Sequence, residues 1–173
     1  MTDITQTLKD EHQNILRVLQ VAEQKCTDME HGKAIDSDFF LRLFDFISIY
    51  ADKFHHAKEE DVLFKAMLEN AQHLHCNPVP VMLYEHDEGR KFLQEMRHAL
   101  AQNQKQELLF ATRCYIDLLS NHIYKEDQVL YPMAEEAISE EEKQLVNQQY
   151  AESEKRVKAA FDVEELLNWG LAV

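Results

Sequence analysis

The chain is poor in the residues that make turns. Among its 173 residues there are only three glycines and three prolines. Turn-rich β proteins need many such residues, so this scarcity disfavours them and favours long helices. Hydrophobic residues make up 45% of the chain, enough for one domain with a full-sized core. We therefore expect residues 1–173 to form a single all-α domain.

Positive charge is also scarce. Eighteen Lys and Arg residues stand against 32 Asp and Glu residues, which gives a net charge of −14. An acidic surface repels nucleic-acid phosphates and anionic lipid headgroups, so we expect no nucleic-acid partner and no membrane association. The sequence also has no apolar stretch long enough to span a membrane, and its N-terminal residues do not resemble a signal peptide.

Cysteine is the third scarce residue. Cys26, Cys76 and Cys114 are widely spaced, odd in number and form no CxxC pair. Such a set fits a reducing compartment, and we expect a cytoplasmic protein. The fingerprints of P-loops, dinucleotide sites and serine nucleophile elbows are absent as well. Phosphoryl transfer and ordinary nucleophilic catalysis therefore have no support in the sequence.

Helical periodicity, by contrast, is abundant. Apolar residues recur every three or four positions in four long segments, at about residues 3–30, 37–71, 82–100 and 108–133. Pro132 should kink or end the fourth segment. Short connections between long helices favour antiparallel neighbours. The pattern predicts an up-down-up-down four-helix bundle over about residues 4–136.

An additional C-terminal helix is expected beyond the bundle. Ser139 followed by Glu142 predicts a capping box, which opens a more polar helix over about residues 139–161. In the remaining tail we expect the side chains of three residues to pack back on the bundle: Leu166, Leu167 and Trp169.

Each of the four bundle segments carries one histidine in its apolar stripe: His12, His56, His86 and His122. Counted outward from the turns, the two histidines of each hairpin lie at nearly the same height, to within about one helical turn. Glu60 follows His56 by four residues, and Glu126 follows His122 by four. This spacing places an imidazole and a carboxylate on one face of a helix. The repeated HxxxED motif thus predicts four imidazoles and two carboxylates at one level of the core.

Such a cluster has the chemistry of a metal site. Two buried carboxylates repel each other and resist desolvation, and a cation relieves both costs. Imidazole and carboxylate suit iron, manganese or zinc. Six ligands exceed the four of a structural zinc site and match two ions bridged by the two carboxylates. One histidine on a helical stripe is usually a core residue, so the prediction depends on the joint pattern.

These residues make the chain resemble the hemerythrin-like, or HHE cation-binding, family. The resemblance covers about residues 4–133, and its anchors are Glu11-His12, His55 to Glu60 with Leu63-Phe64, Glu85-His86 with Gly89-Arg90, and His122 to Pro132. It implies a carboxylate-bridged, non-haem centre of two iron ions, for which manganese or zinc are alternatives. By the match to the family, the terminal ligands are His12, His56, His86 and His122, and the bridges are Glu60 and Glu126.

One position departs from the oxygen-carrying members of this family. They have a further histidine one turn before the position of His86, where this chain has Met82. Either one ion holds fewer protein ligands, or another residue substitutes, for which the candidates are Glu85, His55 and Glu59.

The pair His55 and Glu59 repeats the spacing of His56 and Glu60 one residue out of phase. We expect His56 and Glu60 to face inward, because they align with Leu63 and with the second copy of the motif. His55 and Glu59 are then expected at the flank or in the layer around the ligands. Carboxylates in that layer commonly orient metal-bound imidazoles, and the candidates are Glu11, Glu85 and Asp127.

The resemblance implies a protein that binds oxygen, nitric oxide or peroxide at the metal centre, in a sensing, binding or iron-handling role. A di-iron peroxidase or catalase-like enzyme is one alternative, and an iron donor for repair of iron–sulfur clusters is another. The pattern leaves open whether the protein is an enzyme. A third class is a metal-free acidic interaction bundle. The C-terminal helix could meet a partner protein or a second copy of the chain.

Overall fold

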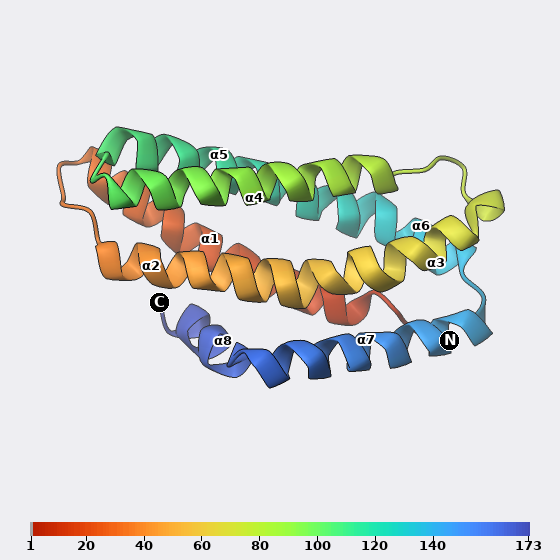
Figure 1. The fold of residues 1–173 in the computed structure, drawn as a ribbon. Coiled ribbons are helices and arrows are strands. Elements are labelled where there is room, and N and C mark those ends of the chain that lie inside the picture. Colours follow the sequence, from red (N-terminus) through yellow and green to blue (C-terminus); the bar gives the residue numbers. More distant parts are fainter. Residues whose placement is uncertain (1) are drawn as a thin grey trace.

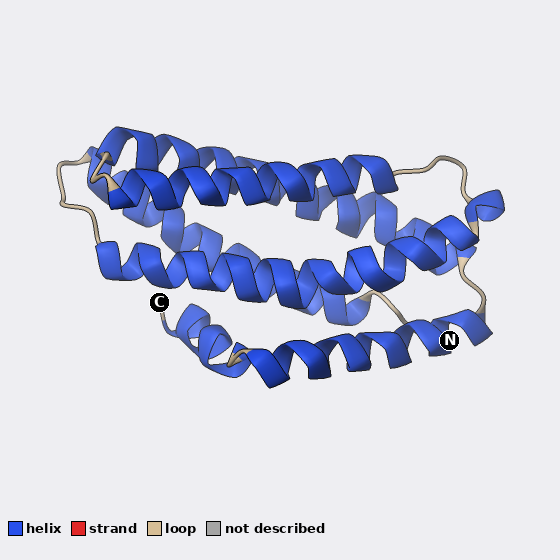
Figure 2. Ribbon diagram, in the orientation of Figure 1, coloured by secondary structure: helices blue, strands red, loops and turns tan. Residues whose placement is uncertain are grey.

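The computed structural model describes residues 2–173, and all regular structure in that range is helical (Figure 2). The α-helices are α1 (Gln6–Glu30), α2 (Ser37–Asp45), α3 (Phe64–Glu69), α4 (Val79–Ala101), α5 (Lys105–Lys125), α6 (Tyr131–Ala137), α7 (Glu140–Ala160) and α8 (Val163–Ala172). Three segments are π-helical, namely η1 (Phe46–His56), η2 (Glu59–Leu63) and η4 (Glu126–Leu130), and η3 (Ala71–His73) is a 3₁₀ turn. The predicted all-α class is confirmed.

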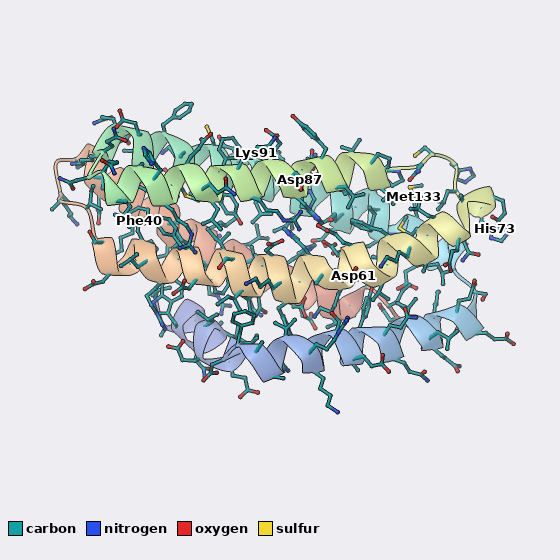
Figure 3. The ribbon with its side chains drawn as sticks, in the orientation of Figure 1. Phe40, Asp61, His73, Asp87, Lys91 and Met133 are labelled. Atoms are coloured by element: carbon teal, nitrogen blue, oxygen red, sulfur yellow. The ribbon has the colours of Figure 1, made fainter. Side chains whose placement is uncertain are left out.

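Four helical rods run antiparallel and form the expected up-down-up-down bundle (Figure 1). The rods are α1, then α2 through α3, then α4, then α5 through α6. The second rod is continuous, because the π-helical η1 and η2 join α2 to α3 without a loop. Side chains fill the space between the rods (Figure 3). Among the described residues, no helix is both long enough and apolar enough to cross a bilayer.

The C-terminal helices lie on the outside of the bundle. The predicted capping box is present, with Ser139 accepting from the Glu142 N–H and the Glu142 carboxylate accepting from the Ser139 N–H. α7 lies along η1 and η2, and α8 turns back against α1 and η1 (Figure 1). Leu166 is buried, and Leu167 and Trp169 pack against the core, as the sequence predicts.

The sequence predicts that Pro132 kinks or ends the fourth rod, and the rod does not end there. The rod continues as α6 to Ala137. Pro132 lies in the first turn of α6, directly after the π-helical η4. In a first turn the missing N–H of proline costs little, since that donor would lack an intrahelical partner anyway.

The core consists of two apolar clusters with a polar layer between them. On α1 the first cluster begins at Ile15 and the second ends at Leu8, so His12 falls between them. On α4 the second cluster ends at Met82 and the first begins at Leu93, so His86 again falls between. The other two rods repeat the interruption between residues 54 and 62 and between residues 123 and 130. All four rods thus lose their apolar character at one common level.

Candidate metal centre

The interrupted level of the core holds two groups of buried histidine and glutamate side chains. We call the first the three-histidine group: His56, Glu59, His86 and His122. We call the second the two-histidine group: His12, His55, Glu59 and Glu126. Within each group, one nitrogen or oxygen from every residue lies within 4.8 Å of the others, and every residue is buried.

Two carboxylates connect the groups. Glu59 belongs to both, with its Oε2 3.4 Å from His86 Nε2 and 3.7 Å from His55 Nε2. Glu126 turns Oε2 to His12 Nε2 at 3.3 Å and Oε1 to His122 Nε2 at 3.1 Å. Each carboxylate therefore lies between the two sets of imidazoles, as a bridge between two ions would.

The spacing of these atoms fits a shared ion in each group. Metal ions of the first transition row hold nitrogen and oxygen ligands at about 2.0–2.2 Å, so neighbouring ligands of one ion lie roughly 3.0–3.5 Å apart. His86 Nε2 and His122 Nε2 are 3.0 Å apart. With the contacts to Glu59 and Glu126, most of the close approaches in the cluster fall in this range.

Four of the five histidines have a carboxylate in hydrogen-bonding contact with Nδ1, and the fifth, His56, has Asp52 nearby without a hydrogen bond. The distances are 2.9 Å from His12 to Asp127, 2.7 Å from His55 to Glu11, 3.5 Å from His56 to Asp52, 2.7 Å from His86 to Glu60 and 2.8 Å from His122 to Glu85. A carboxylate at Nδ1 fixes the ring and leaves Nε2 as the free nitrogen, which is the usual arrangement around metal-bound imidazole. Glu11, Glu85 and Asp127, the candidates for this outer layer in the sequence, each lie against the Nδ1 of one imidazole.

Basic side chains hold most of the outer carboxylates in turn. Lys58, which is completely buried, donates to Glu11 and to Glu154 of α7. Lys125 donates to Glu85. Arg90 donates to both Asp52 and Glu60, each at 2.7 Å from Nη2. The outer layer is therefore fixed from four rods and from α7. Tyr131 adds a contact from within the core, because its hydroxyl donates to Glu59 Oε1 at 2.7 Å.

The pKa values in the centre show that the carboxylates attract positive charge. Burial would lower the pKa of His12, but the neighbouring carboxylates of Asp127 and Glu126 raise it to about 9. Burial is likewise outweighed at His122, where Glu126 and Glu85 raise the pKa to about 10. These imidazoles hold the pKa of Glu126 well below its usual range in spite of its burial. Burial and the neighbouring imidazoles lower the pKa of His56 to about 3.

Several buried atoms of the two groups have no hydrogen-bond partner among the described residues. They are His55 Nε2, His56 Nδ1, Glu59 Oε2 and both carboxylate oxygens of Glu126. Buried polar atoms normally have a partner, and a cluster of unpaired ones needs an explanation. Except for His56 Nδ1, these atoms are electron-pair donors facing the interior, so bound cations would satisfy them. The residues present thus fit metal ions.

The structure brings five of the six predicted ligands together and leaves out Glu60. His12, His56, His86, His122 and Glu126 all belong to the two groups. Glu60 instead lies in the outer layer, half-buried, between His86 Nδ1 and Arg90. Glu59 takes the shared inner position that the sequence pattern assigns to Glu60, and His55 joins it from the same rod.

Glu59 rather than Glu60 faces the core because of how the second rod is rotated about its own axis. π-Helical turns close with i→i+5 hydrogen bonds, which place more residues in each turn than the α-helix does and shift which of them face the core. Here η1 ends at His56 and η2 begins at Glu59. Only the i, i+4 spacing of His55 and Glu59 marked this pair in the sequence, and His56 and Glu60 have the same spacing.

Comparison with known families agrees with this geometry. The family model described as the hemerythrin HHE cation binding domain matches residues 3–134. The chain belongs to this family, and its matched region contains all the residues of both groups. In the same comparisons, no curated protein and no solved structure matched the chain. The fold and the family together define a cation-binding four-helix bundle.

Proposed function

We propose that the protein holds two iron ions, one in each group, and binds a small diatomic or peroxide ligand at this centre. The proposed ligands are His56, His86 and His122 for one ion, His12 and His55 for the other, and Glu59 and Glu126 between them. Imidazole and carboxylate without thiolate suit iron, with manganese and zinc as the competing ions. When bound, two ferrous ions would supply an electron-donating site for a small molecule.

The observation that carries this proposal is the orientation of the five histidines. Four of them, namely His12, His55, His86 and His122, have an acid in hydrogen-bonding contact with Nδ1 and bring Nε2 to within 3.7 Å of an inner carboxylate. A histidine that merely fills a core needs one hydrogen-bond partner, and its Nε2 need not approach the same carboxylates as other histidines do. Four rings ordered in this way, with His56 beside them in the three-histidine group, support a function in holding metal.

His56 supports a full ligand set despite the methionine at position 82. Met82 lies in the second apolar cluster, away from the two groups. The His56 ring stacks on His86 with 3.7 Å between centroids, so η1 brings a third imidazole to the group that α4 and α5 begin. His55 and Glu59 take the inner places that the sequence match gives to His56 and Glu60, so His56 is an additional imidazole. We propose that it replaces the histidine that position 82 lacks.

The surroundings of the centre support binding of a small ligand. The apolar clusters on both sides keep bulk water away, which favours small neutral molecules over large substrates. The ion with two histidines has fewer protein ligands, which leaves room for an added one. We propose that residues 1–173 act as one unit, and free Cys26, Cys76 and Cys114 support a reducing, cytoplasmic setting.

The test is metal analysis of the purified protein together with its visible absorption spectrum. We expect about two irons per chain and an absorption that changes when azide or oxygen is added. Sustained turnover of hydrogen peroxide would move the proposal from a binding protein to an enzyme. Protein that retains no metal after anaerobic loading with ferrous iron would overturn it.

A further inference from the structure

The helix α7 passes the metal centre from outside the region that the family model matches. It runs along the second rod (Figure 1), and the family match ends at residue 134. Val146 and Tyr150 of α7 belong to the second apolar cluster, and Val157 packs against the first. α7 therefore crosses the polar layer between residues 150 and 157, and Glu154 lies in that interval. Like the four rods, α7 brings a charged side chain to the level of the centre.

Lys58 connects Glu154 to the two-histidine group. Its ammonium lies 3.0 Å from Glu154 Oε1 and also donates to Glu11 Oε1. The other oxygen of Glu11, Oε2, lies 2.7 Å from His55 Nδ1. The ammonium is further held over the face of the Phe54 ring, 4.0 Å from its centroid. A continuous chain of polar contacts thus runs from α7 to the His55 imidazole.

This chain is buried, whereas the matching cations of the three-histidine group reach solvent. The Lys58 side chain has no exposed area, and that of Glu11 is 8% exposed. Arg90 and Lys125, which hold the outer carboxylates around the three-histidine group, are 36% and 40% exposed. Water can replace a lost partner of an exposed cation, but a buried ammonium needs its protein partners. Glu154 is therefore needed to keep Lys58 in its place beside Glu11.

We propose that Glu154 and Lys58 are positioning residues of the metal centre. Through Glu11 they hold the His55 imidazole in the orientation that binds metal, and α7 thereby sets the metal affinity of the two-histidine group. The three-histidine group does not depend on α7, because cations of α4 and α5 hold its outer carboxylates. This inference rests on the proposed function. It adds to the centre a helix outside the family match and names the residues through which that helix acts.

Charge and position predict opposite effects of removing Lys58. Lys58→Met takes a positive charge away from a site for cations, so charge alone would strengthen metal binding. Loss of the hold on Glu11 would weaken it instead, because changing a residue in the layer around metal ligands commonly costs about 10- to 100-fold in affinity. Weaker binding in this variant would therefore report positioning.

The test is an anaerobic titration of the protein, loaded with ferrous iron, against a competing chelator. The two-histidine group offers fewer imidazoles, so its ion should leave first. His55→Ala, which removes a ligand of that ion, identifies its step. The proteins compared are wild type, Lys58→Met, Glu154→Gln and the double variant of these two. Urea unfolding shows which of them are folded.

A matched control lies on the same helix. Glu152→Gln makes the same chemical change as Glu154→Gln, two residues away and at an exposed position of α7. It removes one negative charge near the bundle without touching Lys58, so it measures the effect of charge alone. We expect Glu152→Gln to release both ions as the wild type does.

We expect Lys58→Met to weaken binding of the ion that leaves first by about 10- to 100-fold. Glu154→Gln should weaken it by about threefold to tenfold, a smaller loss because Lys58 keeps its bond to Glu11. The double variant should bind no more weakly than Lys58→Met, because Glu154 acts through Lys58. The ion that leaves second should stay within about threefold of the wild type in all of these variants.

Glu154→Gln that releases both ions as Glu152→Gln does would overturn the inference, even if Lys58→Met does not fold. Tighter binding in Lys58→Met, equal weakening of both ions, or additive losses in the double variant would overturn it as well, because charge or general stability would then explain the results. A wild type that holds no iron would overturn the proposed function instead, and metal analysis distinguishes that outcome from the others.

Discussion

His86 and His122 face each other across the bundle with their Nε2 atoms 3.0 Å apart. Both rings already have a carboxylate at Nδ1, Glu60 for His86 and Glu85 for His122. Two nitrogen atoms at this separation fit neighbouring ligands of one ion. The hairpin of α4 and α5 therefore contributes a preformed half of the three-histidine group.

Replacing Glu59 and Glu60 one at a time with glutamine should distinguish a residue inside the metal centre from one in the layer around it. Glu59→Gln removes a charge that both groups share, so we expect it to lose most of the bound metal. Glu60→Gln changes only an outer partner of His86 and Arg90, and we expect a drop of about 10- to 100-fold in metal affinity with the sites retained. Metal content after dialysis and competition with a chelator measures both. Equal loss in the two variants would contradict the placement of Glu59.

Removing the metal should lower the thermal stability. Ions that bind the folded state alone stabilise it, and unpaired inner carboxylates lose their counter-charge when the ions leave. At a metal concentration 100 times Kd, each independent site would contribute about 2.7 kcal/mol, so two sites would raise Tm by roughly 11–22 °C for a chain of this size. Calorimetry before and after chelation gives the shift. An unchanged Tm would mean that the centre binds metal weakly or not at all.

The buried Lys58 should be important for stability as well as for the outer layer. Lys58→Met keeps the bulk of the side chain but leaves Glu11 without its cation. Breaking a buried ion pair from one side costs about 3–5 kcal/mol. Urea unfolding at pH 8 measures it, because burial raises the pKa of Glu11 to about 7 and the group is ionised there. The matched control Lys65→Met, in an exposed pair with Asp61, should change stability by less than about 0.5 kcal/mol.

Two helical glycines should respond to alanine in opposite directions. A Cβ at Gly170 of α8 would lie 2.8 Å from Val18 and 3.1 Å from Phe46, so Gly170→Ala should destabilise by about 1–3 kcal/mol. Gly89→Ala meets only ordinary contacts and should be neutral or stabilise by up to about 1 kcal/mol. Urea unfolding of both variants makes the comparison. If Gly170→Ala were as stable as the wild type, α8 would not be docked as described.

The capping box of α7 should weaken in acid. Hydrogen bonds from Ser139 and Asn70 lower the pKa of Glu142 from 4.5 to about 2. A lowered folded-state pKa stabilises the protein above pH 4.5, and this contribution is lost as the pH falls towards 2. The Tm difference between wild type and Glu142→Gln should therefore shrink from pH 6 to pH 2.5. Glu141→Gln is the control, since Glu141 makes no hydrogen bond in the described range.

The four rods and the level of the centre could be read from the sequence. Apolar spacing marks the helices, and His12, His56, His86 and His122 each interrupt an apolar stripe. Helical rise then sets their heights within each hairpin, because the connecting turns are short. The capping box at Ser139 is equally local, since its partners are three residues apart. These features depend on short-range geometry that a sequence carries directly.

Tertiary structure alone decided which glutamate of the second rod faces the core. Glu59 and Glu60 follow adjacent histidines with the same spacing. The sequence pattern therefore fits two rotations of the second rod about equally well. Packing of η1 and η2 against the other rods selects the rotation that turns His55, His56 and Glu59 inward together, and π-helical turns accommodate it. The sequence determined which types of residue form the candidate centre and their depth in the bundle, because both follow from composition and helical rise. The rotation of the rod was settled by contacts between residues far apart in the chain.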